Sequence, residues 1–185
     1  MSTALALLAC TLFLEVPLGQ SQANEDFQGK LEQHAATHTR QEVAAYAQTL
    51  IQQVTFDAEH AAFVVNGVLL GDGVLLSDGV VVSEPLLLSD EMIACLQNNG
   101  IANTFHGQYC VANQWKACHH AYLASVHASA ARASQVLATC TTNTSTTGFL
   151  QCAAGALNTH ASLIRTAKSQ RGVCAENALQ SCQLQ

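Results

Sequence analysis

Charged side chains are scarce in this chain of 185 residues, and aromatic ones are scarcer still. The former make up 11% of the sequence, about half of the share usual in globular proteins, and the latter make up 5%. The formal net charge is −6 and the few Lys and Arg residues form no cluster, which argues against nucleic acid and anionic membranes as partners. Because large side chains are few, we expect thin cores, with disulfides supplying stability that packing does not.

Motifs of common enzymes are also absent. The sequence has no Gly-x-Ser-x-Gly elbow, no Walker loop, no His-Glu-x-x-His motif and no paired zinc-finger spacing. Acidic residues recur every six positions, as in a Ca²⁺-binding ladder, but they lack the Gly-Gly-x-Gly-x-Asp context and are better explained as turn residues. These residues are Asp72, Asp78, Glu84 and Asp90. The sequence therefore predicts no enzyme and no cofactor.

Histidine is the remaining chemical signal. His34 and His38 are four residues apart on one predicted helix face, where two imidazoles can hold a metal ion. Because no third ligand is near them in the sequence, we interpret them as solvated polar positions and predict no metal site. Below a pH of about 6.5, the eight histidines are expected to add positive charge to a chain that is otherwise net negative.

The first 23 residues, 1–23, have the pattern of a signal peptide. An apolar run over residues 4–14 has the length of a signal-peptide hydrophobic core, and the small residues Ser21 and Ala23 suit cleavage before Asn24. Basic residues before the run are missing, and a membrane anchor is the alternative, but the run is too short to cross about 30 Å of hydrocarbon. We therefore predict a secreted, extracellular protein without a membrane span.

Residues 24–60 are predicted to form one amphipathic helix. Apolar residues recur at spacings of three and four from Phe27 to Val54, and Asn24 or Asp26 can cap the start. The helical pattern ends near residues 55–60.

A six-residue repeat occupies residues 61–90. Four copies follow a degenerate first copy, and three or four β-prone residues in each are followed by Asn-Gly, Asp-Gly or Glu-Pro. Asn-Gly and Asp-Gly favour two-residue hairpin turns, so the simplest structure is a β-meander of very short strands. A left-handed β-helix and a repeat expansion without a fixed fold are the alternatives. Since an open strand edge can pair with another chain, the repeat is a candidate for self-association, although a local core is its simpler role.

Six of the eight cysteines are spaced with mirror symmetry. Their separations are 8, 22, 12, 22 and 8 residues, and 22 residues are close to six helical turns, so the cysteines 22 residues apart share a helix face. Disulfides between antiparallel helices need equal offsets on both sides of one turn, because the paired Cα atoms must lie about 4.4–6.8 Å apart. Among the possible pairings, this symmetry selects one. It joins Cys110 to Cys182, Cys118 to Cys174 and Cys140 to Cys152.

Residues 91–185 are therefore predicted to contain a disulfide-linked antiparallel helical hairpin. The buried stripe of the first helix is expected to include Val136 or Leu137, and that of the second helix Leu163 and Ile164.

A turn-like, Thr-rich stretch over residues 141–148 separates the two helices. It contains the N-glycosylation sequon Asn143-Thr144-Ser145, which predicts an exposed loop and makes Asn143 a candidate glycosylation site.

Cys95 has no partner in the symmetric set. It is the seventh cysteine of the predicted mature chain, and an odd cysteine in a secreted protein indicates an intermolecular disulfide or a free thiol. Cys95 is therefore the candidate for a disulfide between two copies.

The stretch Phe149-Leu-Gln-Cys152, followed by Ala153, Ala156 and Asn158, is similar to a short run in the insect midgut EP-type proteins, the TsetseEP family. The Ala-rich helices with spaced cysteines, from residue 110 to 182, also resemble that family, whereas the six-residue repeat is not part of its pattern. The resemblance implies an extracellular, non-enzymatic helical protein and brings no catalytic residue.

The expected fold class is mainly α with a small β element: an N-terminal helix, a β-meander and a disulfide-linked helical hairpin. The predicted function is that of a secreted structural or interaction protein, which self-associates through the repeat or Cys95. The alternative is an extracellular carrier that binds a small apolar ligand between the first helix, the repeat and the hairpin.

Overall fold

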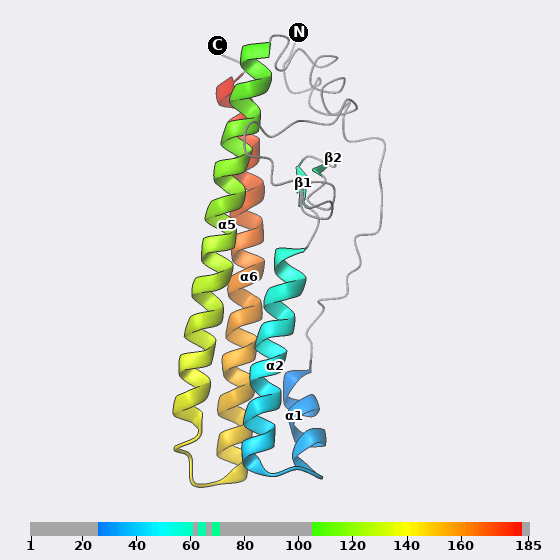
Figure 1. The fold of residues 1–185 in the computed structure, drawn as a ribbon, viewed down its shortest axis with the longest axis vertical. Coiled ribbons are helices and arrows are strands. Elements are labelled where there is room, and N and C mark those ends of the chain that lie inside the picture. Colours follow the sequence, from blue (N-terminus) through cyan, green and yellow to red (C-terminus); the bar gives the residue numbers. More distant parts are fainter. Residues whose placement is uncertain (1–25, 61–62, 66–67, 71–104, 183–185) are drawn as a thin grey trace. The chain divides into compact units, whose positions relative to one another are not determined.

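The structure is a computed structural model, which describes residues 26–60, 63–65, 68–70 and 105–182 (Figure 1). Its elements in chain order are α1 (Phe27–Ala35), α2 (Arg40–Glu59), β1 (Phe63–Val65), β2 (Val68–Leu70), α5 (Phe105–Cys140) and α6 (Thr146–Cys182). The prediction of a mainly helical fold with disulfides between helices is confirmed.

The two strands pair in antiparallel register, with Phe63 opposite Leu70 and Val65 opposite Val68. Most of the six-residue repeat lies outside the described residues, and so do the predicted signal peptide and Cys95. The β-meander over residues 61–90 therefore stays a prediction.

The single helix predicted over residues 24–60 is divided into two helices. α1 begins after Asp26, whose side chain accepts a hydrogen bond from the N–H of Gly29 at 2.8 Å. α2 begins after Thr39, which forms a capping box with Glu42: the Thr39 N–H donates to Glu42 Oε2 at 2.7 Å, and the Glu42 N–H donates to Thr39 Oγ1 at 3.4 Å. Hydrophobic spacing did not reveal this break, because apolar residues are buried on both sides of it.

Three disulfides join α5 to α6, and they link the same cysteines as the set predicted from the mirror spacing. We call them the outer disulfide (Cys110–Cys182), the middle disulfide (Cys118–Cys174) and the tip disulfide (Cys140–Cys152). Their Cα–Cα distances are 5.9, 5.8 and 5.5 Å, within the range that a disulfide requires.

The described residues belong to two compact units, and each unit contains part of α5 and part of α6. The first unit includes the strand pair, residues 105–122 and residues 168–182, with the outer and middle disulfides. Its buried side chains include Trp115, whose indole Nε1 donates to the carbonyl of Ala175 at 3.0 Å. Since a buried indole N–H needs an acceptor, this bond fixes the ring against α6.

The second unit includes α1, α2, residues 123–140 of α5 and residues 146–167 of α6, with the tip disulfide. α2 lies beside α6 (Figure 1), where Thr55 contacts His160, and it also contacts α5, because the Gln48 side chain donates to Ser134 Oγ at 3.0 Å. The α2 face toward this core buries Val43, Ala47, Ile51, Val54 and Ala58.

The structure also decides which apolar residues enter that core. Leu137 is 5% exposed and Val136 38% exposed, so Leu137 is the buried residue of the predicted pair. Ile164 is buried as predicted, but the predicted burial of Leu163 is wrong, because it is 37% exposed. Leu163 and Val136 both line an open groove, which is described below.

Candidate functional site

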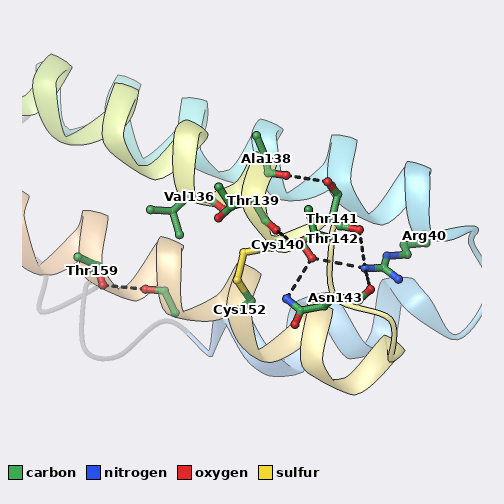
Figure 2. Close-up of a disulfide and its surroundings, with 11 residues drawn as sticks. Arg40, Val136, Ala138, Thr139, Cys140, Thr141, Thr142, Asn143, Cys152 and Thr159 are labelled. Atoms are coloured by element: carbon green, nitrogen blue, oxygen red, sulfur yellow. Dashed lines mark hydrogen bonds between the residues drawn. A yellow bond between two sulfur atoms is a disulfide. The ribbon is translucent and has the colours of Figure 1, made fainter.

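The turn between α5 and α6 contains several polar contacts, and Figure 2 shows it next to the tip disulfide. The carbonyl oxygen of Cys140 accepts hydrogen bonds from the backbone N–H and from the side-chain Nδ2 of Asn143, both at 3.1 Å. Arg40 Nη2 donates to the same oxygen at 3.4 Å. The last carbonyls of a helix have no partner within the helix, so these donors close the end of α5.

Arg40 reaches this turn from the first residue of α2. Its Nη2 also donates to the carbonyl of Thr141 at 3.0 Å and to that of Asn143, and its Cζ lies 4.8 Å from the centre of the Phe149 ring. A cation at the C-terminal end of a helix interacts favourably with the helix dipole. Arg40 thus ties α2 to the turn by charge, by hydrogen bonds and by a cation–π contact.

The sequon Asn143-Thr144-Ser145 takes part in this turn. Asn143 is half-buried, and Ser145 caps α6 by accepting a hydrogen bond at its Oγ from the N–H of Gly148 at 3.0 Å. Only Thr144 keeps its side chain exposed without a capping contact. Glycosylation of Asn143 stays a prediction.

A buried polar cluster joins α2, α5 and α6 in the same unit. His160 is 1% exposed, and its Nδ1 lies 2.8 Å from Ser129 Oγ and its Nε2 3.1 Å from Thr55 Oγ1. The Ser129 hydroxyl donates to the carbonyl of Val126 at 2.9 Å, and the Thr55 hydroxyl donates to that of Ile51 at 2.7 Å. Each hydroxyl has one proton, and that proton is donated to a backbone carbonyl. Each hydroxyl oxygen can therefore only accept a hydrogen bond from the His160 ring.

Only the charged imidazolium could satisfy this arrangement completely, because neutral histidine has one N–H and the cation has two. Burial nevertheless lowers the pKa of His160 below its ordinary value, and a hydrogen bond to the Ile51 backbone opposes that shift. The neutral ring donates to one hydroxyl, and the other hydroxyl must turn from its carbonyl toward the ring. Protonation therefore improves the local hydrogen bonds but costs desolvation, and desolvation is the larger effect.

A groove of about 300 Å³ runs along α5 and α6 beside this cluster. Its lining is mostly apolar or small, with Gly155 leaving space and Arg132 supplying a cation. The lining residues are Ser129, Arg132, Ala133, Val136, Cys152, Gly155, Ala156, Thr159, His160 and Leu163. A volume of this size is at the lower end of those of small-molecule sites. Its lining comes from α5 and α6 alone, and most of the repeat, which is part of the predicted ligand site, lies outside the described residues.

His34 and His38, predicted on one helix face, form a stack, but only His34 lies in α1, and His38 lies in the connection before α2. The His34 and His38 ring centres are 3.9 Å apart, and the His34 ring also stacks on Tyr46 at 4.3 Å. His38 Nδ1 lies 3.0 Å from the His34 carbonyl oxygen, so this nitrogen is used within the turn. Among the residues that the structure describes, no three His, Cys, Asp or Glu side chains form a group that could hold a metal ion.

The Thr39 backbone and hydroxyl lower the pKa of Glu42, in that order of effect, and the nearby His38 and His34 lower it further. This carboxylate is fully exposed, so its ionisation serves the cap of α2 and does not mark a catalytic acid.

The first unit contains a buried cation, Arg171, which is 2% exposed. Its Cζ lies 4.2 Å from the centre of the Tyr122 ring, and its Nη1 donates toward His119 Nδ1 at 3.3 Å. An acceptor at Nδ1 places the proton of neutral His119 on Nε2. The sequence indicates neither His119 nor Arg171 as a site residue.

Three charged or titratable residues thus carry contacts that the sequence did not indicate: Arg40, His160 and Arg171. Their partners are at least 31 residues away along the chain, so no local spacing identifies them. His160 alone leaves a trace in the sequence, because a polar residue interrupts an otherwise apolar helical stripe.

Comparisons with protein-family models, with curated proteins and with solved structures found no match to this chain. The resemblance to the TsetseEP family therefore stays an expectation from the sequence. Within the described helices, none has both the length and the apolar character needed to cross a membrane.

Proposed function

We propose that this chain is a secreted structural or interaction protein, in which the disulfide-linked hairpin is a stiff support. The observation that carries the proposal is the set of three disulfides between α5 and α6. Disulfides of this kind persist in oxidising, extracytoplasmic compartments. The signal-peptide pattern of residues 1–23 and the resemblance to the TsetseEP family favour the same extracellular role.

The chemistry of the buried cluster supports a non-enzymatic role. Ser129 and His160 have the spacing of a nucleophile and a base, but both are almost fully buried and the Ser129 hydroxyl donates to a carbonyl. Both residues also lie inside long helices, where backbone N–H groups bond along the helix and cannot form an oxyanion hole. The cluster is better suited to holding three helices together than to acyl transfer.

Self-association is the interaction that we propose for this protein, through the six-residue repeat or through Cys95. Removing residues 73–84, two whole repeats, preserves the register of the remaining copies. Light scattering from pH 7 down to pH 4 should show growing association of the full chain as the repeat acids approach their ordinary pKa of about 4. Equal scattering by the shortened chain would assign the repeat to an ordinary core.

The groove favours a second candidate function, that of a carrier for a small amphiphile. Apolar walls suit an acyl chain, and Arg132 suits an anionic head group. From Cys152 to Leu163 the groove follows about 16 Å of α6, at the helical rise of about 1.5 Å per residue.

Two glycines of α6 provide a matched test of the carrier function. A Cβ atom added at Gly155 or at Gly172 would meet no other atom within 4 Å, so both positions accept a side chain, but only Gly155 lines the groove. Native mass spectrometry of extracted protein should find a co-purifying lipid in the wild type and in Gly172→Phe, and lose it in Gly155→Phe. Wild-type protein without bound lipid would contradict the carrier function, and the structural role would then be the only one proposed.

A further inference from the structure

The sequon and the tip disulfide occupy one turn, and the fold uses the sequon's own reactive groups. Asn143 Nδ2 is the atom to which an N-linked glycan is attached, and it donates to the Cys140 carbonyl at 3.1 Å. Ser145 Oγ, the hydroxyl that completes the sequon, accepts the Gly148 N–H at 3.0 Å. In the folded turn both groups are therefore engaged, so the sequon must leave the turn before a glycosyl-transferring enzyme can bind it.

We propose that Asn143 is glycosylated only before Cys140 and Cys152 join, so that closure of the tip disulfide ends the period in which the sequon can react. This inference rests on the proposed secretion, because disulfide formation and N-glycosylation both belong to the secretory route.

Two covalent steps are in competition. Glycosylation replaces one Nδ2–H of Asn143 by a bond to the anomeric carbon of a lipid-linked oligosaccharide, the bond from that carbon to the donor's pyrophosphate breaks, and the proton leaves with the lipid pyrophosphate. Disulfide closure takes two hydrogens from the thiols of Cys140 and Cys152, and a disulfide-carrying oxidoreductase is reduced to its dithiol.

Timing makes the disulfide the decisive step. A side-chain cap contributes about 1 kcal/mol, and helix and coil exchange within about a microsecond, so hydrogen bonds alone let the turn reopen repeatedly. Cys152 follows Asn143 by only nine residues, which takes about 0.5–2 s at about 5–20 residues per second of synthesis. From then on the disulfide can form within seconds, and once formed it does not reopen on that timescale.

Closure of the tip disulfide prevents glycosylation, but glycosylation does not prevent closure. A side-chain amide has two N–H groups, of which one reaches the Cys140 carbonyl and the other can be replaced by the glycan. Because Asn143 is only half-buried, a glycosylated chain can still fold the turn and close the tip disulfide. A chain that has already closed the disulfide cannot present the sequon.

The test expresses the full chain in a eukaryotic secreting cell and compares the wild type with the double variant Cys140→Ser/Cys152→Ser. The matched control is Cys110→Ser/Cys182→Ser, which loses the outer disulfide and leaves the turn unchanged. The glycosylated fraction is measured by the mobility shift after enzymatic glycan removal and located by peptide mass. We expect partial glycosylation of the wild type and the control, a larger fraction in the tip variant, and all three disulfides in glycosylated wild-type protein.

The inference would be overturned by equal glycosylated fractions in the wild type and the tip variant, by a wild type that is already fully glycosylated, or by glycosylated molecules that lack the tip disulfide. Secreted protein without glycan in any variant would overturn it and leave the proposed secretion intact. Retention of every variant inside the cell, without glycan, would contradict secretion and this inference together.

Discussion

The guanidinium of Arg40 lies at the carbonyl oxygen of Cys140, with Nη2 3.4 Å from that oxygen and 100 residues between the two along the chain. Arg40 therefore connects the start of α2 to the end of α5 next to the tip disulfide. The same Nη2 also donates to the carbonyls of Thr141 and Asn143, 101 and 103 residues away, so one guanidinium makes all three long-range contacts of this turn.

Replacing Arg40 should destabilise the second unit. Arg40→Met keeps the apolar stem beside Phe149 but removes three hydrogen bonds to carbonyls, and we expect the free energy of unfolding to fall by about 1.5–3 kcal/mol. The control is Arg165→Met, since Arg165 is exposed and contacts only its own helix at the Ala161 carbonyl. That change should stay within about 0.5 kcal/mol in chemical denaturation. Equal losses in the two variants would contradict the role of Arg40.

The disulfides should be coupled energetically, because the outer one is nested around the middle one. With the middle disulfide intact, the outer disulfide closes only the two eight-residue segments from Cys110 to Cys118 and from Cys174 to Cys182. Without it, the loop extends to the tip disulfide. Loop-closure entropy then makes the outer disulfide worth about 1 kcal/mol more.

A double-mutant cycle measures this difference. Both cysteines of the outer disulfide are changed to Ser, with and without the same change in the middle disulfide, and unfolding is followed in denaturant without reductant. Strictly additive losses would show that the nested-loop account is wrong.

His160 should make the second unit sensitive to acid. Its pKa is lowered in the folded protein, so below the unfolded value of about 6.5 the unfolded chain binds a proton that the folded chain does not. The free energy of unfolding must then decrease as the pH falls from about 6.5 toward the folded pKa, and the stabilisation is fully present above this window. The His160→Gln variant should lose this part of the pH dependence.

The control for this prediction is His120→Gln, which removes an exposed ring from α5. Urea denaturation at pH 7.5 and pH 5.5 should give it the same decrease as the wild type. A His160→Gln variant with an unchanged decrease would mean that His160 is not the acid-sensitive group.

How much of this arrangement the sequence predicts depends on whether the signal is local. The cysteine spacing predicts the disulfide pairs directly. In two antiparallel helices, residues at equal sequence distances from the turn lie at equal distances along the helix axis, and therefore opposite each other. The break between α1 and α2 also had a local signal, since Thr39 and Glu42 have the spacing of a capping box, but the apolar periodicity on both sides concealed it.

The contacts of the candidate sites lacked such signals. Nothing in the sequence around Arg40 or Arg171 distinguishes them from arginines on a protein surface. Only the packing of distant segments brings them to Cys140 and Tyr122. Val136 and Leu163 fit a buried stripe by spacing, yet they stay partly exposed at a groove whose lining includes the small residues Gly155 and Ala156. Helical periodicity predicts which face of the helix a residue occupies, but it does not predict whether a neighbouring side chain is large enough to cover that residue.

Cys95 lies outside the described residues, and its predicted role can be tested separately. If it joins two copies, the secreted protein should run as a dimer without reductant, and Cys95→Ser should abolish the dimer while the three internal disulfides remain. A monomer with one titratable thiol would instead make Cys95 a small apolar side chain.

The proposal of a secreted, disulfide-supported protein is tested most directly by the non-reduced peptide map of the chain recovered from the medium of secreting cells. We predict an N-terminus at Asn24 and linked peptides for the outer, middle and tip disulfides. An uncleaved chain found only inside cells with its cysteines reduced, or a link from Cys110 to Cys118, would contradict it.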